Sequence, residues 1–549
     1  MKMGANRRLA NVKTRKETGL DYVVQNLNLQ TPFGKKEVSE IKPFFPGEED
    51  ELRTELNRVE KLIQFKEENP GLVDTVLETF MEAKDISFSV DRASKNTLSE
   101  VEVYDVKAML LLMAKLNKTI TDVDGNPRVP AEYVLEDTTD LLDLLDPRKD
   151  RISTFYVYDE FSPKLGAFRA QKRQAEVAIR KAQKEKREEI KKNYGVMLTP
   201  KFDISVARSH GDLEKIQNIP ELEVVDQDYM SITFQLKPTP EVFDYMKDIE
   251  SINEQIDEEE ERILRELSMK IGQHKEVLDT NMERMGKLDF GLAKAIFAKE
   301  HNLVKPEIVE DHIVEIEDGR NIQVEDILRS RNKEYCPVSI ALEEGVTCIT
   351  GANMGGKTIS LKLSGQVPIL AQYGFFVGAA KAKVGLSNYI HILVGDSQSV
   401  ERGLSTFGSE MEELKDILDR AVPRSIILID EIASGTNPVE GLALTRSLID
   451  YLIKNPYISL ITTHFETVTQ TKGVVNMQVA GLSNCNFELL NREIQYAKRR
   501  ERINIISKYM DYRLVKVEKQ GEVPKEALNI VKMLGLNSEI IEGAKKYIK

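Results

Sequence analysis

The sequence has few cysteines and few histidines, and this scarcity limits the sites that it can build. It contains three cysteines and six histidines in 549 residues. The cysteines, Cys336, Cys348 and Cys485, stand far apart, with no C-x-x-C pair and no clustered histidines to complete a zinc site. We therefore expect neither a disulfide framework nor a structural metal centre, and we expect the protein in a reducing cytoplasm.

Long apolar runs and an excess of positive charge are also missing. No stretch of about 18 consecutive apolar residues occurs, and the basic N-terminus MKMGANRRLANVKTRKE has no apolar segment behind it. Neither export nor a membrane partner is expected. The net charge of −13 gives no general encouragement to nucleic-acid binding, although a local basic patch could still bind.

The chain does have enough length and charge for several folded domains. Its 549 residues, 30% of them charged, correspond to roughly three or four domains of ordinary size. Glycine and proline are at ordinary levels and no low-complexity tract occurs. The composition therefore predicts a folded, helix-rich, multidomain protein.

The most specific motif is a phosphate-binding loop. Residues 351–358, GANMGGKT, satisfy G-x-x-x-x-G-K-[ST], in which glycines let backbone N–H groups close around phosphate oxygens. A β-rich run precedes the loop and a helical apolar pattern follows it, which is the context that the motif needs. The alternative is a glycine-rich turn without nucleotide. The motif predicts ATP and Mg²⁺, with Lys357 reaching the β- and γ-phosphates and Thr358 a metal ligand. The predicted nucleotide-contacting residues in the loop are Gly351, Asn353, Gly355, Gly356, Lys357 and Thr358.

Two further apolar runs end in residues suited to the same chemistry. RSIILIDE (424–431) is predicted to be a strand that delivers Asp430 to Mg²⁺ and Glu431 to the attacking water. The alternative is a strand that ends in solvated acids. ISLITTHFE (458–466) is predicted to be a third strand, ending at His464, which could sense the γ-phosphate and polarise water. A lone histidine is more often structural, so both roles stay open for His464.

These motifs, in this order, resemble the ATPase domain of the MutS family. The segments are TGANMGGKT, LSTFGSEM (404–411), LIDEIASGTNPVEGLAL (428–444) and TTHFE (462–466), and the resemblance covers roughly residues 305–490. It implies an ABC-type ATPase that closes as a homodimer, or as a heterodimer with a MutS-like partner. In such a dimer Ser405 would contact the γ-phosphate of the other subunit, and Gly435–Thr436 would lie near the shared interface. Without the family, Ser405 is an ordinary helix cap, and the two roles are compatible.

The remaining segments resemble the lever and clamp of the second bacterial branch of this family. Neither the mismatch-reading domain nor the nuclease-like module of its relatives is expected in this sequence. The expected fold is an α/β ABC-type P-loop ATPase domain, a mainly α-helical lever domain, and a long helical-hairpin clamp with a small β tip. The expected boundaries are 1–160 for the helical core and lever, 161–275 for the clamp with its tip at about 200–238, 276–304 for a returning lever helix, and 305–549 for the ATPase with a helical dimerisation segment.

Two oppositely charged segments are predicted to form the arms of the clamp. Residues 163–193 are helical and basic, and residues 241–270 are helical and acidic. We expect an antiparallel hairpin with the basic arm against the acidic arm, so the basic arm is not predicted to bind DNA. The apolar stripe of the second arm is predicted to be Phe243, Met246, Ile249, Ile252 and Ile256.

The tip between the arms is acidic. It contains four basic residues, Lys201, Arg208, Lys215 and Lys237. It contains seven acidic residues, Asp203, Asp212, Glu214, Glu221, Glu223, Asp226 and Asp228. Such a tip would repel a duplex, which favours a protein client.

Two functions from different classes follow. The favoured one is an ATPase that remodels a protein client, because stand-alone MutS-like ATPases are associated with adenosylcobalamin-dependent aminomutases, notably lysine 5,6-aminomutase, as reactivating factors. The alternative is MutS-type binding of mismatched or branched DNA in repair or recombination. A scaffold whose nucleotide only locks the dimer is less compatible with an intact Glu431.

Overall fold

The computed structural model describes residues 8–351, 356–395, 406–433, 435–482, 485–496, 502–517 and 526–547. Contacts divide the chain into two compact units. The first comprises Met1–Met81, Ile120–Val134 and Met285–Lys549, and the second comprises Glu82–Thr119 and Leu135–Arg284. The four-part division expected from the sequence groups residues by role, and it stays a prediction.

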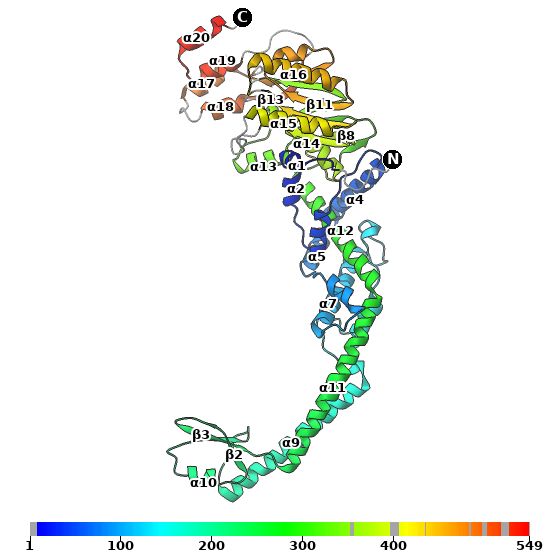
Figure 1. Ribbon diagram of the computed structural model, residues 1–549, viewed down its shortest axis with the longest axis vertical. Coiled ribbons are helices and arrows are strands. Elements are labelled where there is room, and N and C mark those ends of the chain that lie inside the picture. Colours follow the sequence, from blue (N-terminus) through cyan, green and yellow to red (C-terminus); the bar gives the residue numbers. More distant parts are fainter. Residues whose placement is uncertain are drawn as a thin grey trace. The chain divides into compact units, whose positions relative to one another are not determined.

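A six-stranded sheet forms the centre of the first unit (Figure 1). Its strands, in spatial order, are β13 (Asp511–Lys516), β12 (Val474–Gly481), β7 (Gly345–Thr350), β11 (Tyr457–Thr462), β10 (Ser425–Asp430) and β9 (Tyr389–Leu393). All pairs are parallel except β12 with β13. The three central strands β7, β11 and β10 are almost entirely buried, as parallel strands covered on both faces require. The first five residues of β10 are buried, and only Asp430 is partly exposed.

Helices cover the sheet in layers. On one face α15 (Thr406–Arg420) and α16 (Pro438–Ile453) pack on a core that includes Ile427 and Ile461. The helix after the phosphate loop, α14 (Lys357–Gln372), contacts β9, β10 and β11. It also contacts β5 and β8 of a second sheet, so it is almost wholly buried. The order of that sheet is β4 (Glu307–Val309), β8 (Lys381–Gly385), β5 (Val314–Gly319) and β6 (Val338–Leu342). This arrangement confirms the α/β part of the predicted fold.

The first unit also contains the N-terminal helices and the helices at the C-terminal end. The N-terminal ones are α1 (Val12–Glu17), α2 (Leu20–Gln25), α3 (Pro32–Ser39), α4 (Glu49–Glu68) and α5 (Pro70–Met81). Of these, α1 packs on β9, and α2 packs on α14 and α13 (Ile322–Ser330). The C-terminal ones are α17 (Phe487–Tyr496), α18 (Arg502–Tyr509), α19 (Glu526–Met533) and α20 (Ser538–Tyr547).

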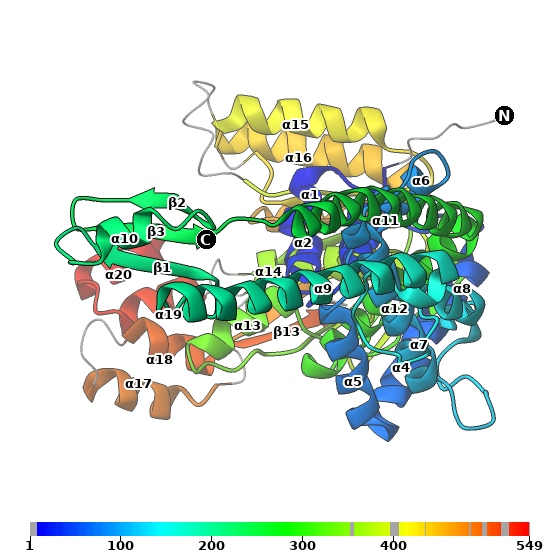
Figure 2. The ribbon, with the colours of Figure 1, turned by 90° about the horizontal axis from the view of Figure 1, so that it is seen from below.

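The second unit is helical apart from a small sheet. Its helices are α6 (Ser87–Ala93), α7 (Glu100–Ile120), α8 (Thr139–Leu145), α9 (Pro163–Tyr194), α10 (Leu213–Gln217) and α11 (Pro240–Gln273), and α12 (Lys275–Glu300) begins in it. The two longest, α9 and α11, pack against each other, and Figures 1 and 2 show them side by side. Between them lie β1 (Asp203–Ala207), β2 (Leu222–Gln227) and β3 (Ser231–Leu236), antiparallel in the order β1-β3-β2. Lever and clamp roles for these parts stay predictions.

The apolar seam of α11 differs from the predicted stripe. Phe243 and Met246 are about half exposed, at 52% and 50%, whereas Val242 and Ile256 are buried. The seam follows a seven-residue repeat from Val242 through Ile256 to Ile263, which is the spacing that keeps one face of a long helix against its partner. Phe243 lies about 100° around the helix from Val242, so the prediction was wrong for that end of the stripe.

The predicted pairing of a basic arm with an acidic arm is also wrong for most of the charges. Among the residues that the structure describes, one ion pair joins α9 to α11, between Arg169 and Glu260 at 2.6 Å. The other charged side chains mostly point to solvent, because the apolar and small residues of both helices occupy the contact. In the described ranges, no helix is both long enough and apolar enough to cross a membrane.

Candidate functional site

The phosphate loop, the acid pair and His464 come together because three parallel strands end at one edge of the sheet. Asp430 in β10 pairs in register with Thr462 in β11, and Thr462 pairs with Ile349 in β7. The residues that follow each strand therefore emerge side by side, at the carboxyl edge where open α/β sheets bind their ligands. Gly351 follows β7, Glu431 follows β10, and His464 follows β11 by two residues.

Lys357 lies at the centre of this site. It is the first residue of α14, and Gly356 before it adopts the left-handed conformation (φ 79°) that allows the chain to turn into the helix. Its Nζ donates to the carbonyl of Gly351 at 2.8 Å and lies 3.2 Å from Glu431 Oε1. Burial lowers the pKa of Lys357, and the nearby Glu431 and Asp430 carboxylates act in the opposite direction.

Thr358 and Asp430 lie together as the sequence predicts for metal ligands. The Thr358 hydroxyl donates to Asp430 Oδ2 at 2.8 Å, and Thr462 Oγ1 donates to the other carboxylate oxygen, Oδ1, at 2.5 Å. Hard oxygen donors on one or two side chains, completed by water and substrate phosphates, are the set that Mg²⁺ prefers. The residues present therefore fit the predicted ion.

Glu431 contacts both Lys357 and His464. His464 Nε2 lies 2.9 Å from Glu431 Oε1, and His464 Nδ1 lies 3.3 Å from Lys357 Nζ. A proton on Nε2 satisfies both contacts. Glu431 also has a left-handed backbone (φ 50°), which is unusual for a residue with a side chain. Its N–H donates to the Thr462 carbonyl at 3.1 Å and to the Thr462 hydroxyl at 3.0 Å.

Two positioning residues were missed by the sequence analysis. Thr462 is fully buried and bonds both to Asp430 and to the backbone of Glu431. Glu410 of α15 accepts from the N–H of Ala433 at 3.1 Å, and so fixes the loop after Glu431. Ala433 also has a left-handed backbone (φ 60°). Burial raises the pKa of Glu410. The only signal for either residue was its place inside a motif whose other members had been assigned.

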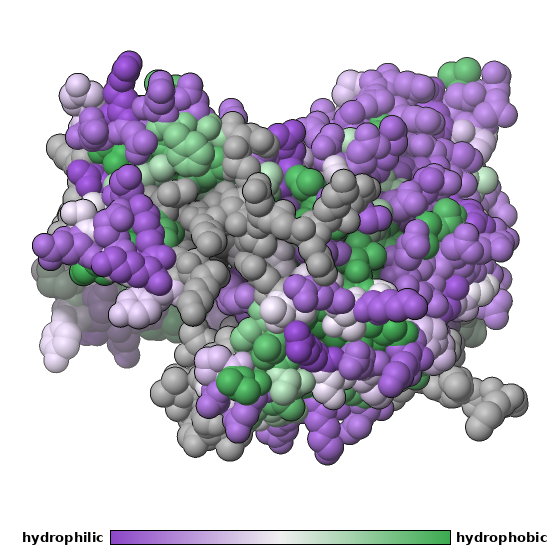
Figure 3. Space-filling model, turned by 90° about the horizontal axis from the view of Figure 1, so that it is seen from above, coloured by the Kyte–Doolittle hydropathy of each residue, from purple (hydrophilic) through white to green (hydrophobic). Residues whose placement is uncertain are grey.

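Three predicted nucleotide contacts, Asn353, Gly355 and Ser405, lie outside the described residues. Gly435 and Thr436 are described, and Thr436 borders a surface hollow of about 490 Å³. The hollow is lined by Phe407, Thr436, Glu440, Ala443 and Leu444. Leu444 in this lining exposes 44% of its surface, and Val439, on the same helix α16, exposes 76%. Figure 3 shows that apolar side chains, in green, also interrupt the hydrophilic surface of the upper face.

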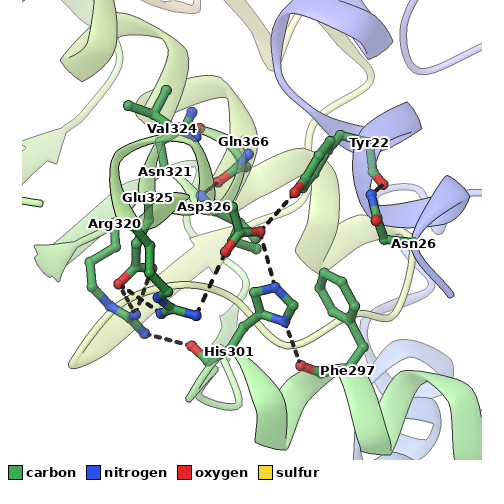
Figure 4. Close-up of polar contacts among 12 residues, drawn as sticks. Tyr22, Asn26, Phe297, His301, Arg320, Asn321, Val324, Glu325, Asp326 and Gln366 are labelled. Carbon is green, nitrogen blue, oxygen red and sulfur yellow. Dashed lines mark hydrogen bonds and ion pairs between the residues drawn. The ribbon is translucent and has the colours of Figure 1, made fainter. Parts of the chain in front are cut away.

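A second polar cluster joins α14 to three neighbouring helices (Figure 4). The side-chain oxygen of Gln366 in α14 accepts from the N–H of Ile322, the first residue of α13, at 2.9 Å. Asp326 in α13 accepts from the Tyr22 hydroxyl of α2 at 2.8 Å and lies 3.1 Å from His301 Nε2, directly after α12. The helix that begins at the phosphate loop is thus linked through α13 to both α2 and the end of α12.

Comparison with known proteins finds a family model and several relatives that match parts of this chain. Residues 347–549 match the family model MutS domain V. A protein named Endonuclease MutS2 from Clostridium tetani is 28% identical over 479 residues, covering 81% of this chain and 56% of that protein. Proteins of the same name from Caldanaerobacter subterraneus subsp. tengcongensis and Shouchella clausii are 28% identical over 408 residues and 37% identical over 208 residues. The first match covers 72% of this chain and 47% of the relative. The second covers 37% of this chain and 26% of the relative. The chain thus spans about half or less of these curated relatives, and the matches support membership of the MutS family.

Proposed function

We propose that this protein hydrolyses ATP with Mg²⁺ and uses the cycle to act on structured duplex DNA. The observation that carries the ATPase proposal is the meeting of Lys357, Thr358, Asp430, Glu431 and His464 at the end of a phosphate loop. A cationic loop residue, two metal-binding oxygens and a carboxylate base are the parts that phosphoryl transfer to water needs.

Each side chain has a separable role. Lys357 would exchange the Glu431 carboxylate for phosphate oxygens, since both compete for its Nζ. Release from Lys357 would free Glu431 to accept a proton from the attacking water, with His464 keeping the carboxylate oriented. Thr358 and Asp430 would hold Mg²⁺, which when bound neutralises charge on the phosphate oxygens. Thr462 keeps Asp430 and the backbone of Glu431 in register.

The ATPase units are proposed to pair through the surface around the hollow on α16. Exposed apolar side chains there border Thr436, the segment that the MutS resemblance puts near the shared interface. Burial of such a patch in a second subunit is favourable because it removes apolar surface from water. Ser405 would then reach the nucleotide of the other subunit.

The choice of DNA as client rests on the relatives. The matched proteins are named endonucleases, and no comparison supports an aminomutase client. The reactivating-factor function favoured by the sequence analysis therefore gives way to its alternative. The link from α14 through α13 to the end of α12 supports the idea that nucleotide-driven movement reaches distant helices.

A protein client remains the second candidate, because of one observation at the tip. The β2–β3 turn fully exposes Tyr229 and leaves Met230 79% exposed, and Asp226 and Asp228 flank them. An exposed aromatic and a methionine beside two acids suit an apolar protein surface with some basic groups better than a phosphate backbone.

ATPase turnover of the purified protein would test both candidates. It would be measured alone, with mismatched or branched duplex, and with an inactivated aminomutase, each at two salt concentrations. We expect stimulation by duplex that collapses at the higher salt, because phosphate contacts release counterions. Stimulation by the inactivated aminomutase but not by duplex would overturn the DNA proposal. Absence of any ATP turnover would overturn the ATPase proposal.

A further inference from the structure

The solvent-facing side of α9 carries a dense set of cations. The inward stripe of the helix, which includes Leu165, Ile179 and Ile190, is partly or fully buried. The opposite side, by the 3.6-residue period, is exposed. The exposed charged residues of α9 from Arg173 onward are the six cations Arg173, Arg180, Lys181, Lys184, Lys191 and Lys192, and the four acids Glu176, Glu185, Glu188 and Glu189.

These cations are mostly not neutralised by the protein itself. Five of the six, all but Lys191, form no ion pair within 4.0 Å to any residue in the described part of the chain, and Lys191 is 4.0 Å from Glu188. Net positive charge that a fold leaves facing water, on a chain whose overall charge is −13, needs a reason. An external polyanion supplies one.

Four of the six cations lie along one line of the helix. Arg173, Arg180, Lys184 and Lys191 are separated by seven, four and seven residues, so they lie on one side of the helix over about 27 Å. Duplex DNA carries one negative charge per about 1.7 Å of its axis, so such a line faces phosphates along its whole length. Guanidinium and ammonium groups on long, flexible side chains can adjust to that spacing.

The acidic residues of α11 do not cancel this line. Packed helices lie about 8–10 Å apart, so the outward faces of α9 and α11 are about 20 Å apart. The Debye length at physiological salt is about 8 Å. Exposed acids such as Glu254 and Glu261 on α11 are therefore largely screened from a ligand on α9.

The tip offers no comparable surface. The uncovered face of its sheet has Ser205 and Thr233 at the centre, their hydroxyls 3.2 Å apart. In the paired registers around them stand the acids Asp203, Glu223 and Asp226. No lysine or arginine occurs in these three strands. A phosphate backbone would be repelled there.

We propose that duplex DNA lies with its phosphate backbone along the outward cations of α9, and that the tip makes no phosphate contacts. This assignment rests on the proposed action on DNA and adds the surface that does it. It reverses the expectation from sequence that the basic arm is used up in pairing with the acidic one.

Salt-dependent binding to a fluorescent branched duplex would test the assignment. The test variant is R173Q/R180Q/K181Q/K184Q, since glutamine keeps helix propensity. The matched control is K201Q/K215Q/K247Q/K270Q, which removes the same charge from exposed positions in the tip and α11. We expect the test variant to bind at least about tenfold more weakly at low salt. For this variant, the slope of the logarithm of the binding constant against the logarithm of salt concentration should be shallower by about 0.9 for each lost phosphate contact. The control should bind like the wild type.

The outcomes separate the two proposals. Wild-type affinity in the α9 variant, or equal weakening in the control, would overturn the assignment while DNA binding stands. A wild type that binds no duplex at any salt would overturn the DNA function itself. Basal ATPase without DNA serves as the folding check, because none of the substituted residues belongs to the nucleotide site.

Discussion

Glu431 and Lys357 form an ion pair with each other in this structure. Their side chains lie 3.2 Å apart, and Lys357 is almost fully buried. A buried cation needs a partner, so phosphate oxygens that take over Lys357 also release Glu431. In the proposed mechanism, substrate binding and release of the Glu431 base are therefore a single exchange of partners at Lys357. This favours Glu431 as the base over a purely structural ion-pair role.

Replacing Glu431 with Gln should separate binding from hydrolysis. We expect nucleotide affinity to be retained and turnover to fall by about 10²- to 10⁴-fold, because the amide cannot accept the proton from water. Affinity would be measured by calorimetry and turnover by phosphate release. Glu412→Gln, an exposed change of the same charge on α15, is the control. Turnover at the wild-type rate in Glu431→Gln would remove this residue from the role.

Thr462 offers a sharper test of the site's internal order. Thr462→Val keeps the shape but loses the bond to Asp430 and one acceptor for the Glu431 N–H. Bonds to charged groups contribute about 1.5–3 kcal/mol, so turnover should fall roughly 10- to 100-fold and need more Mg²⁺. Thr462→Ser keeps the hydroxyl, so it should retain the wild-type turnover and Mg²⁺ requirement. A magnesium titration of ATPase activity decides, and an unaffected valine variant would contradict the role.

At the scale of elements, α14 connects the candidate nucleotide site to the rest of its unit. It begins at Lys357, and its buried Gln366 bonds to the backbone at the start of α13 and to the Thr18 carbonyl, 2.9 Å away. A helix enclosed between two sheets can shift only with its neighbours. The polar cluster at α13 is therefore the first place where a displacement of the loop would be felt.

Gln366→Met should lower the thermal stability of the first unit, because it removes this link. Methionine fills a similar volume but leaves the Ile322 N–H and the Thr18 carbonyl without their partner in a buried place. Each loss costs about 1–3 kcal/mol. The calorimetric transition of the first unit should drop by roughly 4 °C or more. Gln171→Met, on the exposed side of α9, should not shift it. Equal midpoints for the two variants would contradict this account.

At the scale of the whole molecule, the exposed apolar surface around α16 is the proposed site of pairing between two subunits. Its apolar residues are too exposed to stabilise a monomer, since only buried apolar area contributes. A glutamate in this patch would have to lose its hydration on pairing. The fold of a single subunit would be little affected.

Leu444→Glu should therefore prevent ATP-dependent pairing. In the Glu431→Gln background, ATP should produce a dimer detectable by analytical ultracentrifugation, and adding Leu444→Glu should leave it monomeric at micromolar concentration. Met81→Glu, at another exposed apolar position (72%), is the control and should still dimerise. A dimer in the Leu444 variant would place the interface elsewhere.

What the sequence alone determined lies within short segments. The phosphate loop holds its glycines, Lys357 and Thr358 within eight residues, and the apolar runs before Asp430 and His464 predict buried strands. Such features depend on local conformation and on the hydrophobic effect, and both can be predicted from the order of neighbouring residues. The α/β nature of the ATPase part followed from them.

Only the tertiary structure decided which residues act together. Thr462 supports Asp430 from 32 positions away, and Glu410 fixes the loop at Ala433, because strand register and helix packing bring them close. The arms were misjudged for the same reason. Opposite charge suggested that α9 and α11 pair through it, but apolar burial is worth more than an exposed ion pair. The apolar seam took the contact, and the cations of α9 were left facing water.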